Sequence, residues 1–455
     1  MIVEEQNAVN SRVTRKDALT LLPALSYDAS FWRQGRHHKE REVYRKKAFF
    51  SMGGKFWYFR TGLIPRVQMF CNLKDIPLEI QAPEYEIEST DPKIKGIVLR
   101  DDQEALINKC RDNLRGIIQA PTGTGKTILQ IGIMSCFPQY NILLLAHTID
   151  IVQQTYDELQ SRDFENVQMI GGEHKNKTIK RRIVVSTVQS FGKIPPEQYT
   201  DHFEVVIVDE AHHVSKDNGY YAKVLSNLLA PIRLGFTATM PDNEETTFNM
   251  EGLLGPKIGE LTINEATELN ILAKPKIRLV KTPYIHSVHD ARRYDDVYNL
   301  GVVNNRARNR LILSITDDYI KEGKSVLILI TLLEHGDNLI NMAEKLFNFP
   351  IEFVRGSTDS VLRKRIKESL ISKEIKCVVA SSVWREGINI PTLDVVINAC
   401  GGKSEIMTLQ ALGRGLRRTG EKKEVVIVDF FDPSHNFLIR HFGERVTLYM
   451  DNNWL

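Results

Sequence analysis

The sequence predicts two tandem α/β domains, each with a parallel sheet, preceded by a small α+β domain. Two series of short hydrophobic runs indicate the two sheets. Their Val, Ile and Leu residues are consecutive rather than alternating, as in strands that helices cover on both faces. The length of 455 residues fits roughly three domains of ordinary size.

The small N-terminal domain is expected over residues 1–95. It contains a strand-like stretch, AFFSMGGKFWYFRTG from Ala48, and a helix-like stretch, LIPRVQMFCNL from Leu63. An acidic segment with two prolines, QAPEYEIESTDPKIKG from Gln81, follows them. This composition indicates a linker to the next domain.

The two α/β domains are expected over residues 96–270 and 271–440, with residues 441–455 as a C-terminal tail. The strand-like runs of the first are RGIIQA, NILLLAH, RRIVVST, FEVVIVDE and RLGFTAT. Those of the second are SVLILIT, IEFVRG, IKCVVASS, LDVVINA and KEVVIVDF. The two series indicate a pair of related layered domains.

Composition excludes several classes of protein. The five cysteines are far apart and form no CxxC pair, which argues against a disulfide framework or a zinc site. The first residues, MIVEEQNAVNSR, lack the positive charge and apolar core of a signal peptide. The longest apolar run, VLILITLL from Val326, is about half of what a membrane span requires. We therefore expect a cytoplasmic protein with no membrane partner.

The segment IIQAPTGTGKT joins a strand, a glycine-rich turn and an apolar helix, and it matches the P-loop pattern with alanine in the first place. Glycines let the backbone amides turn toward phosphate oxygens at the helix N-terminus. The lysine would reach the outer phosphates, and the final threonine would hold Mg²⁺. The predicted nucleotide contacts are Pro121, Thr122, Gly123, Thr124, Gly125, Lys126 and Thr127.

Two acids end the strand-like run VVIVDEAHH. Asp209 and Glu210 would be costly to bury there unless a cation or a reacting water occupies the site. Asp209 suits Mg²⁺, and Glu210 suits a general base for the attacking water; acids with a purely structural role are the alternative. His212 and His213 lack the spacing of a zinc site, and we expect His212 to hydrogen-bond toward the segment TAT at 237–239 or toward the next domain.

Basic clusters raise the possibility of nucleic-acid binding that the net charge of +3 does not establish. Residues 11–60 hold twelve basic residues against four acids, beside Phe31, Trp32 and FWYF at 56–59. If FWYF is a strand, its side chains alternate between two faces, and half of them would face the core of their own domain. For EHKNKTIKRR at 173–182, RARNR at 306–310 and RKRIK at 363–367, a solvated helix face stays open beside phosphate binding.

The motifs occur in the order LRDDQ (99–103), APTGTGKT (120–127), STVQSF (186–191), DEAH (209–212), TAT (237–239), VWREGINIP (383–391) and QALGRGLRR (410–418). Together they resemble the superfamily 2 helicases. Within that superfamily the likeness is to the DEAH-type DNA remodelling motors, including the UvsW-like and XPB-like branch-remodelling helicases and the type I and III restriction motors.

The resemblance implies RecA-like folds for both α/β domains and a requirement for ATP and Mg²⁺. It implies that Thr237 and Thr239 link nucleotide state to nucleic-acid binding. Nucleotide contacts are implied for Gln103, Arg100, Asp209, Gly387 and Asn389, with Thr127 and Asp209 at the metal. Catalytic roles are implied for Lys126, Glu210, Gln410, Arg414 and Arg417. Nucleic-acid contacts are implied for Ser186, Thr187, Gln189, Thr331 and Gly356.

These features and the resemblance predict an ATP-dependent DNA helicase or double-strand translocase that remodels forks, Holliday junctions or D- and R-loops in recombination, repair or replication. The resemblance implies movement from 3′ to 5′. The alternatives are an RNA helicase, the motor of a restriction-type complex, or an ATP-gated clamp that binds nucleic acid without moving. We expect branched or partly single-stranded DNA as the partner, contacted mainly through its backbone. We also expect a monomer that is located in a bacterial or phage-infected cytoplasm. Replication or recombination proteins are its expected further partners.

Overall fold

The computed structural model describes residues 1–34, 39–172, 178–214, 219–241, 243–381, 390, 392–402 and 424–455. The chain divides into two compact units. The first comprises Met1–Ala120 and Gly125–Leu261, and the second comprises Pro121–Thr124 and Thr262–Leu455. In the described part of the chain, no helix combines the length and apolar character that crossing a bilayer requires.

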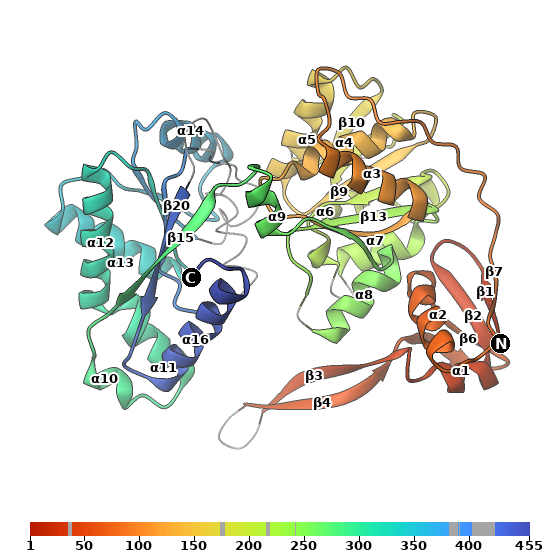
Figure 1. The fold of residues 1–455 in the computed structure, drawn as a ribbon, viewed down its shortest axis with the longest axis horizontal. Helices are drawn as coiled ribbons and strands as arrows, with labels where there is room; N and C mark the ends of the chain where they lie inside the picture. Colours follow the sequence, from red (N-terminus) through yellow and green to blue (C-terminus); the bar gives the residue numbers. More distant parts are fainter. Residues whose placement is uncertain are drawn as a thin grey trace. The chain divides into compact units, whose positions relative to one another are not determined.

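The N-terminal part of the first unit is a five-stranded sheet with two helices (Figure 1). The strand order is β5 (Phe49–Gly53), β6 (Phe56–Arg60), β2 (Asn10–Thr14), β1 (Ile2–Glu5) and β7 (Glu79–Gln81), and the helices are α1 (Arg15–Leu21) and α2 (Ile64–Leu73). Trp57 and Phe59 face the core and are 8% and 0% exposed, which confirms that half of FWYF is structural. The predicted strand and helix over residues 48–73 are therefore present.

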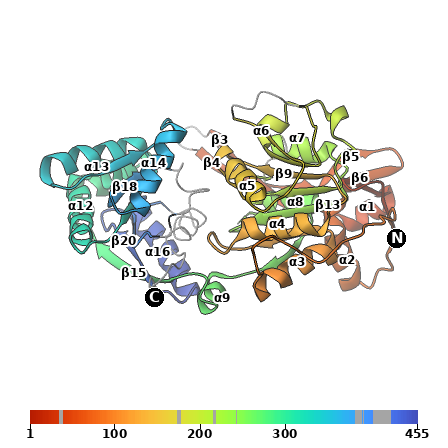
Figure 2. The ribbon, with the colours of Figure 1, turned by 90° about the horizontal axis from the view of Figure 1, so that it is seen from above.

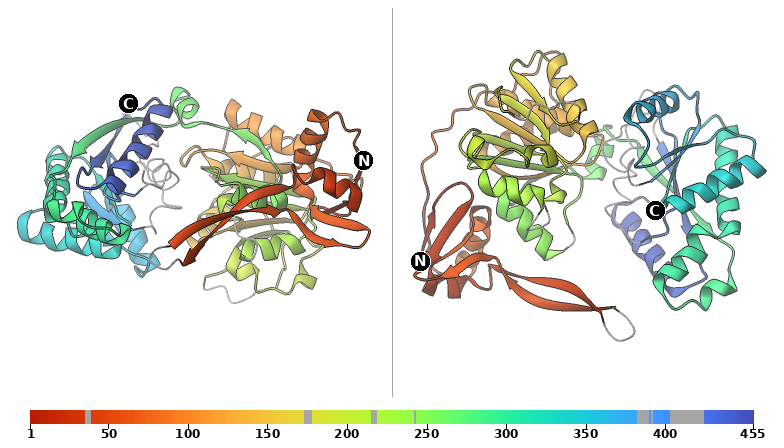
Figure 3. Two further views of the ribbon diagram at one scale, coloured as in Figure 1. Left: turned by 90° about the horizontal axis from the view of Figure 1, so that it is seen from below. Right: turned by 180° about the vertical axis from the view of Figure 1, so that it is seen from behind.

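A long two-stranded hairpin, β3 (Ser26–Gln34) and β4 (Lys39–Lys47), leaves this sheet (Figure 3). Its base lies along α8 (Glu244–Leu254). The Asp28 amide donates to Glu244, the Lys46 ammonium lies 3.2 Å from a Glu245 oxygen, and the rings of Tyr27 and Phe248 are 4.9 Å apart. These contacts attach the hairpin to the α/β domain of the same unit.

The backbone of the small domain also packs directly against α8. A side chain at Gly62 would clash with the main-chain oxygens of Glu251 and Gly252, so only glycine fits there. Beside it, the Arg66 guanidinium pairs with the Glu251 carboxylate and covers the Phe248 ring. The small domain therefore shares a closely packed seam with the α/β domain.

The predicted linker contains no helix or strand between residues 82 and 100. It is nevertheless held in place: the Glu88 amide donates to the Tyr140 hydroxyl, the Thr90 amide to the Cys136 carbonyl, and the Lys93 amide to Ser135. The segment therefore follows a fixed path across the end of α4 (Lys126–Cys136).

The first α/β domain contains a seven-stranded sheet in which every pairing is parallel. The order is β10 (Val167–Ile170), β11 (Ile183–Thr187), β9 (Ile142–Ala146), β12 (Val205–Val208), β13 (Ile232–Thr237), β8 (Arg115–Gln119) and β14 (Lys257–Glu260). Helices α3 (Asp101–Asn113) and α4 lie on one side, and α6 (Val188–Phe191) and α7 (Tyr220–Asn227) on the other (Figure 2). Helix α5 (Ile149–Ser161) packs on β9, β10 and β11. This layered arrangement confirms the predicted fold class.

Arg233 is buried completely inside this domain without a carboxylate among its hydrogen-bond partners. Its guanidinium donates to the main-chain oxygens of Leu225, Leu228 and Leu253, at 2.8, 2.8 and 2.6 Å. These oxygens belong to the C-terminal ends of α7 and α8, where the helix dipoles are negative. Burial lowers the Arg233 pKa to about 9.

The second α/β domain has a six-stranded parallel sheet. The order is β15 (Lys274–Lys281), β20 (Glu424–Phe431), β19 (Val395–Asn398), β16 (Val326–Leu329), β18 (Cys377–Ala380) and β17 (Glu352–Val354). Its helices are α9 (Ile263–Glu268), α10 (His286–His289), α11 (Tyr294–Tyr298), α12 (Arg306–Lys321), α13 (Leu333–Leu346), α14 (Ser360–Ile371) and α16 (Asn436–Asp451). Helix α16 continues past residue 440, and the buried Tyr449 donates to Asp429 at 2.7 Å.

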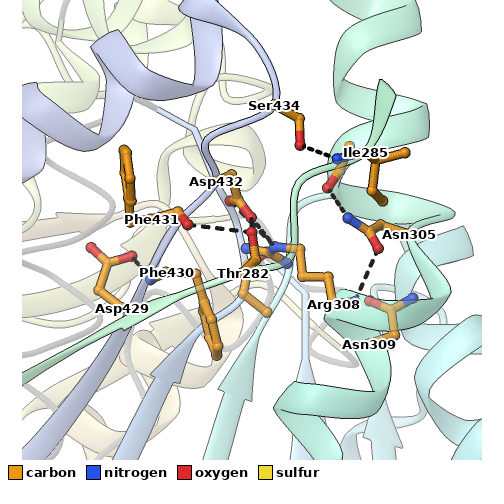
Figure 4. A network of polar contacts seen from close by, with 12 residues as sticks. Thr282, Ile285, Asn305, Arg308, Asn309, Asp429, Phe430, Phe431, Asp432 and Ser434 are labelled. Carbon is orange, nitrogen blue, oxygen red and sulfur yellow. Dashed lines mark hydrogen bonds and ion pairs between the residues drawn. The ribbon is translucent and has the colours of Figure 1, made fainter. Parts of the chain in front are cut away.

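Arg308, from the basic stretch RARNR, is fully buried in this domain. Its Nε donates to both oxygens of Asp432, at 3.0 and 3.3 Å, and Thr282 donates to the same carboxylate (Figure 4). Its Nη1 donates to the Ala399 carbonyl at 3.1 Å. Arg308 is thus neither a phosphate ligand nor part of a solvated helix face: it joins α12 to the segments that follow β19 and β20.

Candidate functional site

The P-loop connects β8 to α4 through two glycines in the left-handed region, Gly123 at φ 91° and Gly125 at φ 96°. A side chain at Gly125 would lie 2.8 Å from the Gln103 amide nitrogen. The Thr124 hydroxyl donates to the Pro121 carbonyl at 2.8 Å and closes the turn. The loop therefore keeps its backbone close to the helix N-terminus, as phosphate binding requires.

Gln103 lies against this loop from the first turn of α3. It is 3% exposed, and its carbonyl oxygen accepts from the Arg100 amide at 3.3 Å. The Arg100 guanidinium makes two hydrogen bonds to Asp102, at 2.8 and 2.9 Å. The structure thus brings Gln103 and the P-loop together, while Arg100 is paired with a carboxylate.

Lys126 and Thr127 occupy the first turn of α4. The Lys126 ammonium donates to the Ala120 carbonyl at 3.3 Å and lies 3.7 Å from a Glu210 oxygen. Thr127 and Thr122 are both half-buried. The ammonium therefore lies between the P-loop backbone and the second acid of DEAH.

Asp209 and Glu210 directly follow β12 and are 8% and 6% exposed. Asp209 accepts a hydrogen bond from Gln130 at 2.9 Å, and burial, followed by the neighbouring Glu210, raises its pKa to about 6. Glu210 adopts φ 47°, and its buried Oε2 makes no hydrogen bond among the described residues. Two adjacent buried carboxylates, one of them with a raised pKa, fit a site that takes a divalent cation.

His212 contacts the TAT segment as the sequence predicts. Its Nδ1 lies 3.1 Å from the Thr237 hydroxyl and 3.5 Å from Glu210 Oε2. The Thr237 hydroxyl in turn donates to the Thr239 carbonyl at 2.8 Å. The DEAH and TAT segments are therefore joined through one imidazole.

The predicted nucleic-acid contacts of this domain differ in accessibility. Ser186 is fully buried, and its hydroxyl lies 2.9 and 3.0 Å from the carbonyls of Ile170 and Thr187, so its side chain is committed to the interior. Thr187 caps α6 by accepting from the Ser190 amide. Gln189 is half-buried, with its amide nitrogen 3.5 Å from His147 Nδ1.

In the second domain, Thr331 and Gly356 are exposed just after β16 and β17. Because those strands belong to one parallel sheet, both positions lie at the same edge of that sheet. The other residues predicted there lie outside the described residues, namely Gly387, Asn389, Gln410, Arg414, Arg417 and the neighbouring Arg418.

Sequence reasoning missed Gln130, which donates to Asp209, and the contact of His147 with His213. Gln130 is the single amide in the apolar helix TILQIGIM, four residues after Lys126, so it lies on the same face. This spacing could have indicated that Gln130 lies near the site. His147 and His213 come from separate segments, and their pairing depends on strand order.

Comparisons with known proteins agree with this geometry. Residues 96–242 match the family described as type III restriction enzyme, res subunit, and residues 308–419 match the helicase conserved C-terminal domain. The chain is 28% identical over 397 residues to "DNA 3′-5′ translocase XPB2" of Sulfurisphaera tokodaii, covering 77% of this chain and 86% of that one. It is 22% identical over 384 residues to "ATP-dependent DNA helicase uvsW" of Enterobacteria phage T4, covering 77% and 74%.

The fold is also similar to that of Saccharomyces cerevisiae Dbp5, solved with RNA and ADP BeF3. The TM-score is 0.55 at 17% identity, over 78% of this chain and 88% of that one. That likeness shows the fold of the two RecA-like domains. The two matched domains and the relatives make this chain similar, over both of its α/β domains, to the superfamily 2 helicases and translocases.

Proposed function

We propose that this protein is an ATP-dependent DNA helicase or double-strand translocase that remodels branched DNA, such as forks, Holliday junctions and D- or R-loops. The observation that carries the proposal is the cluster of Lys126, Asp209 and Glu210 at the strand ends that also present Thr187 and Gln189. Parallel strands β8, β9, β11, β12 and β13 all end at that edge. Nucleotide chemistry and strand binding would thus share one rigid edge.

The residues present fit a magnesium nucleotide. Lys126 would hold the outer phosphates, and Thr127 and Asp209 would hold the ion. Bound Mg²⁺ would supply positive charge against the phosphate oxygens. Glu210 would orient the attacking water and accept its proton, because its carboxylate has an oxygen that makes no hydrogen bond among the described residues. Arg414 and Arg417 would reach the terminal phosphate, with Gln410 beside them.

The choice of DNA over RNA rests on the relatives whose names specify DNA. The similarity to Dbp5 concerns the fold alone and leaves an RNA helicase as the alternative. The motor of a restriction-type complex is the second alternative, supported by the match of residues 96–242. The phage relative supports a bacterial or phage-infected cytoplasm, and we propose a monomer that works with replication or recombination proteins.

The N-terminal domain would select the DNA structure. Arg15, Lys16 and Lys55 are exposed, and the Arg15 amide donates to the Lys55 carbonyl, so these three cations lie together. Stacking by the FWYF aromatics is less well supported: Trp57 is in the core, and Arg12 and Lys55 lie over the Phe56 ring, at 4.3 and 5.4 Å from its centre. Backbone phosphates are thus the expected ligand.

The proposal is tested by measuring ATP turnover with single-stranded, duplex, forked and four-way DNA and with RNA of matching sequence. We expect forked or four-way DNA to stimulate turnover most, and Lys126→Ala to abolish it. Equal stimulation by RNA would favour the RNA helicase. Stopped-flow translocation separates a motor from an ATP-gated clamp, because a clamp gives a signal independent of strand length.

The N-terminal role is tested with Arg15→Glu/Lys16→Glu/Lys55→Glu. The matched control is Lys109→Glu/Lys193→Glu/Lys223→Glu, which changes three exposed cations of the α/β domain by the same charge. We expect the first variant to bind forks more weakly and with a smaller dependence on salt, and the control to remain near wild type. Equal affinities of the two variants for forks would refute selection by this domain.

A further inference from the structure

Three imidazoles form a partly tilted stack at the carboxyl edge of the first sheet. The ring centres of His212 and His213 are 4.3 Å apart with planes tilted by 37°, and those of His213 and His147 are 4.0 Å apart with planes 16° from parallel. His147 follows β9 and the other two follow β12, which is the neighbour of β9 in the sheet. Strand pairing therefore fixes the two sides of the stack.

One end of the stack meets Glu210, the carboxylate proposed as the general base. The Thr237 hydroxyl donates its proton to the Thr239 carbonyl, so it accepts from His212, and Nδ1 of His212 carries the hydrogen. Glu210 Oε2 lies 3.5 Å from that same nitrogen and makes no hydrogen bond among the described residues. A small tilt of the His212 ring would thus shift its N–H from Thr237 toward Glu210.

The other end meets a residue proposed to contact the DNA backbone. The Gln189 amide nitrogen lies 3.5 Å from His147 Nδ1, at the outer limit of a hydrogen bond. Both side chains are half-buried, so a strand that binds Gln189 could change this contact. An unbroken series of contacts then runs from Gln189 through three rings to Glu210.

We propose that His147 and His213 are positioning residues that couple the binding of the DNA backbone at Gln189 to the orientation of Glu210. The inference rests on the proposed function, since it needs DNA to stimulate hydrolysis. His147 contacts Gln189 and His213, and His213 contacts His212, so each would act through its neighbour. Their effect should appear in stimulation by DNA rather than in hydrolysis without it.

The test uses the full chain with a single-stranded thymidine oligonucleotide and its mixed-sequence counterpart. Turnover and the KM for ATP are measured without DNA and at saturating DNA. Variants are His147→Ala, His213→Ala and His213→Phe, which keeps a flat ring in the stack. His202→Ala is the control, because His202 packs edge-on against Phe203 in the same domain, away from this series.

We expect His147→Ala and His213→Ala to reduce the stimulation by DNA roughly 2- to 30-fold, the usual range for residues between coupled sites. Turnover without DNA and the KM for ATP should change less than about twofold. His213→Phe should restore most of the stimulation, and His202→Ala should leave it unchanged.

Three results would overturn the inference: wild-type stimulation in both alanine variants, equal losses with and without DNA, or a phenylalanine variant as impaired as the alanine variant. The two histidines come from different segments, so misfolding of one variant leaves the other as a test. A wild-type protein that no DNA stimulates would instead refute the proposed function. The two failures are therefore distinguishable.

Discussion

Lys126 Nζ lies 3.7 Å from Glu210 Oε1, and the two side chains are 10% and 8% exposed. The two residues are 84 positions apart in the sequence, and their contact joins the P-loop to the DEAH segment. The ammonium therefore lies beside the carboxylate that is proposed as the general base. The contact joins the part of the site proposed to bind phosphate to the part proposed to activate water.

Glu210→Gln should retain ATP binding and lose turnover by about 10²- to 10⁴-fold, because the amide keeps the shape of the side chain but cannot accept the proton. Equilibrium binding of a fluorescent ATP analogue and steady-state phosphate release measure the two quantities. Lys126→Ala serves as the comparison and should lose both. Turnover close to wild type in Glu210→Gln would remove Glu210 from catalysis.

Asp209→Asn should change the pH dependence of stability in the absence of Mg²⁺. The Asp209 pKa in the fold is about 6, above its ordinary value of 3.8, so the folded state binds the proton more tightly than the unfolded state. This stability is present below pH 4 and lost as pH rises through 6. The asparagine variant should thus be more stable than wild type at pH 8 by about 3 kcal/mol and similar near pH 4.

Urea unfolding of both proteins between pH 4 and 8 measures this difference. Excess Mg²⁺ with nucleotide should reduce the advantage of the variant at pH 8, because the ion offsets the carboxylate charge. A constant difference across the range would contradict the assignment of the buried charge to Asp209.

Arg233→Met should lower the free energy of unfolding by about 3 kcal/mol. The methionine fills the space, but three buried carbonyls at the ends of α7 and α8 lose their donor. Chemical unfolding measures the loss. Arg45→Met is the control: Arg45 is half exposed and pairs with Asp28 at the surface, so it should cost less than about 1 kcal/mol. Equal losses would show that Arg233 does not secure the helix ends.

Arg414→Ala should reduce turnover by about 10³- to 10⁵-fold while ATP affinity falls far less, because a guanidinium on the terminal phosphate acts mainly on the transition state. Steady-state turnover and nucleotide titration give the two numbers. Arg418→Ala is the comparison, since a role at the phosphate is not assigned to it. Equal losses of affinity and turnover in Arg414→Ala would mean that the arginine only binds nucleotide.

The sequence predicts the features that are local in the chain. The P-loop and the DEAH segment are each a strand followed at once by its functional residues, so their positions follow from the parallel sheet. The hairpin of residues 26–47 was not predicted. Tyr27 and Ala29 alternate with polar residues and are buried at its base, but this pattern is short, and the charged stretch KEREVYRKK from Lys39 shows no such alternation. The inward orientation of the Ser186 hydroxyl could not be predicted from the sequence, because it depends on the register of β10 and β11.

The bare backbone at Gly62 has a practical consequence for anyone who builds chimeras from this protein. Removing the N-terminal domain at the linker would expose the surface of α8 that packs against that domain. A different accessory domain placed there would not be complementary to this surface. A chimera that transfers residues 1–81 together with α8 keeps this interface intact. A chimera joined at the apparent domain border separates its two sides.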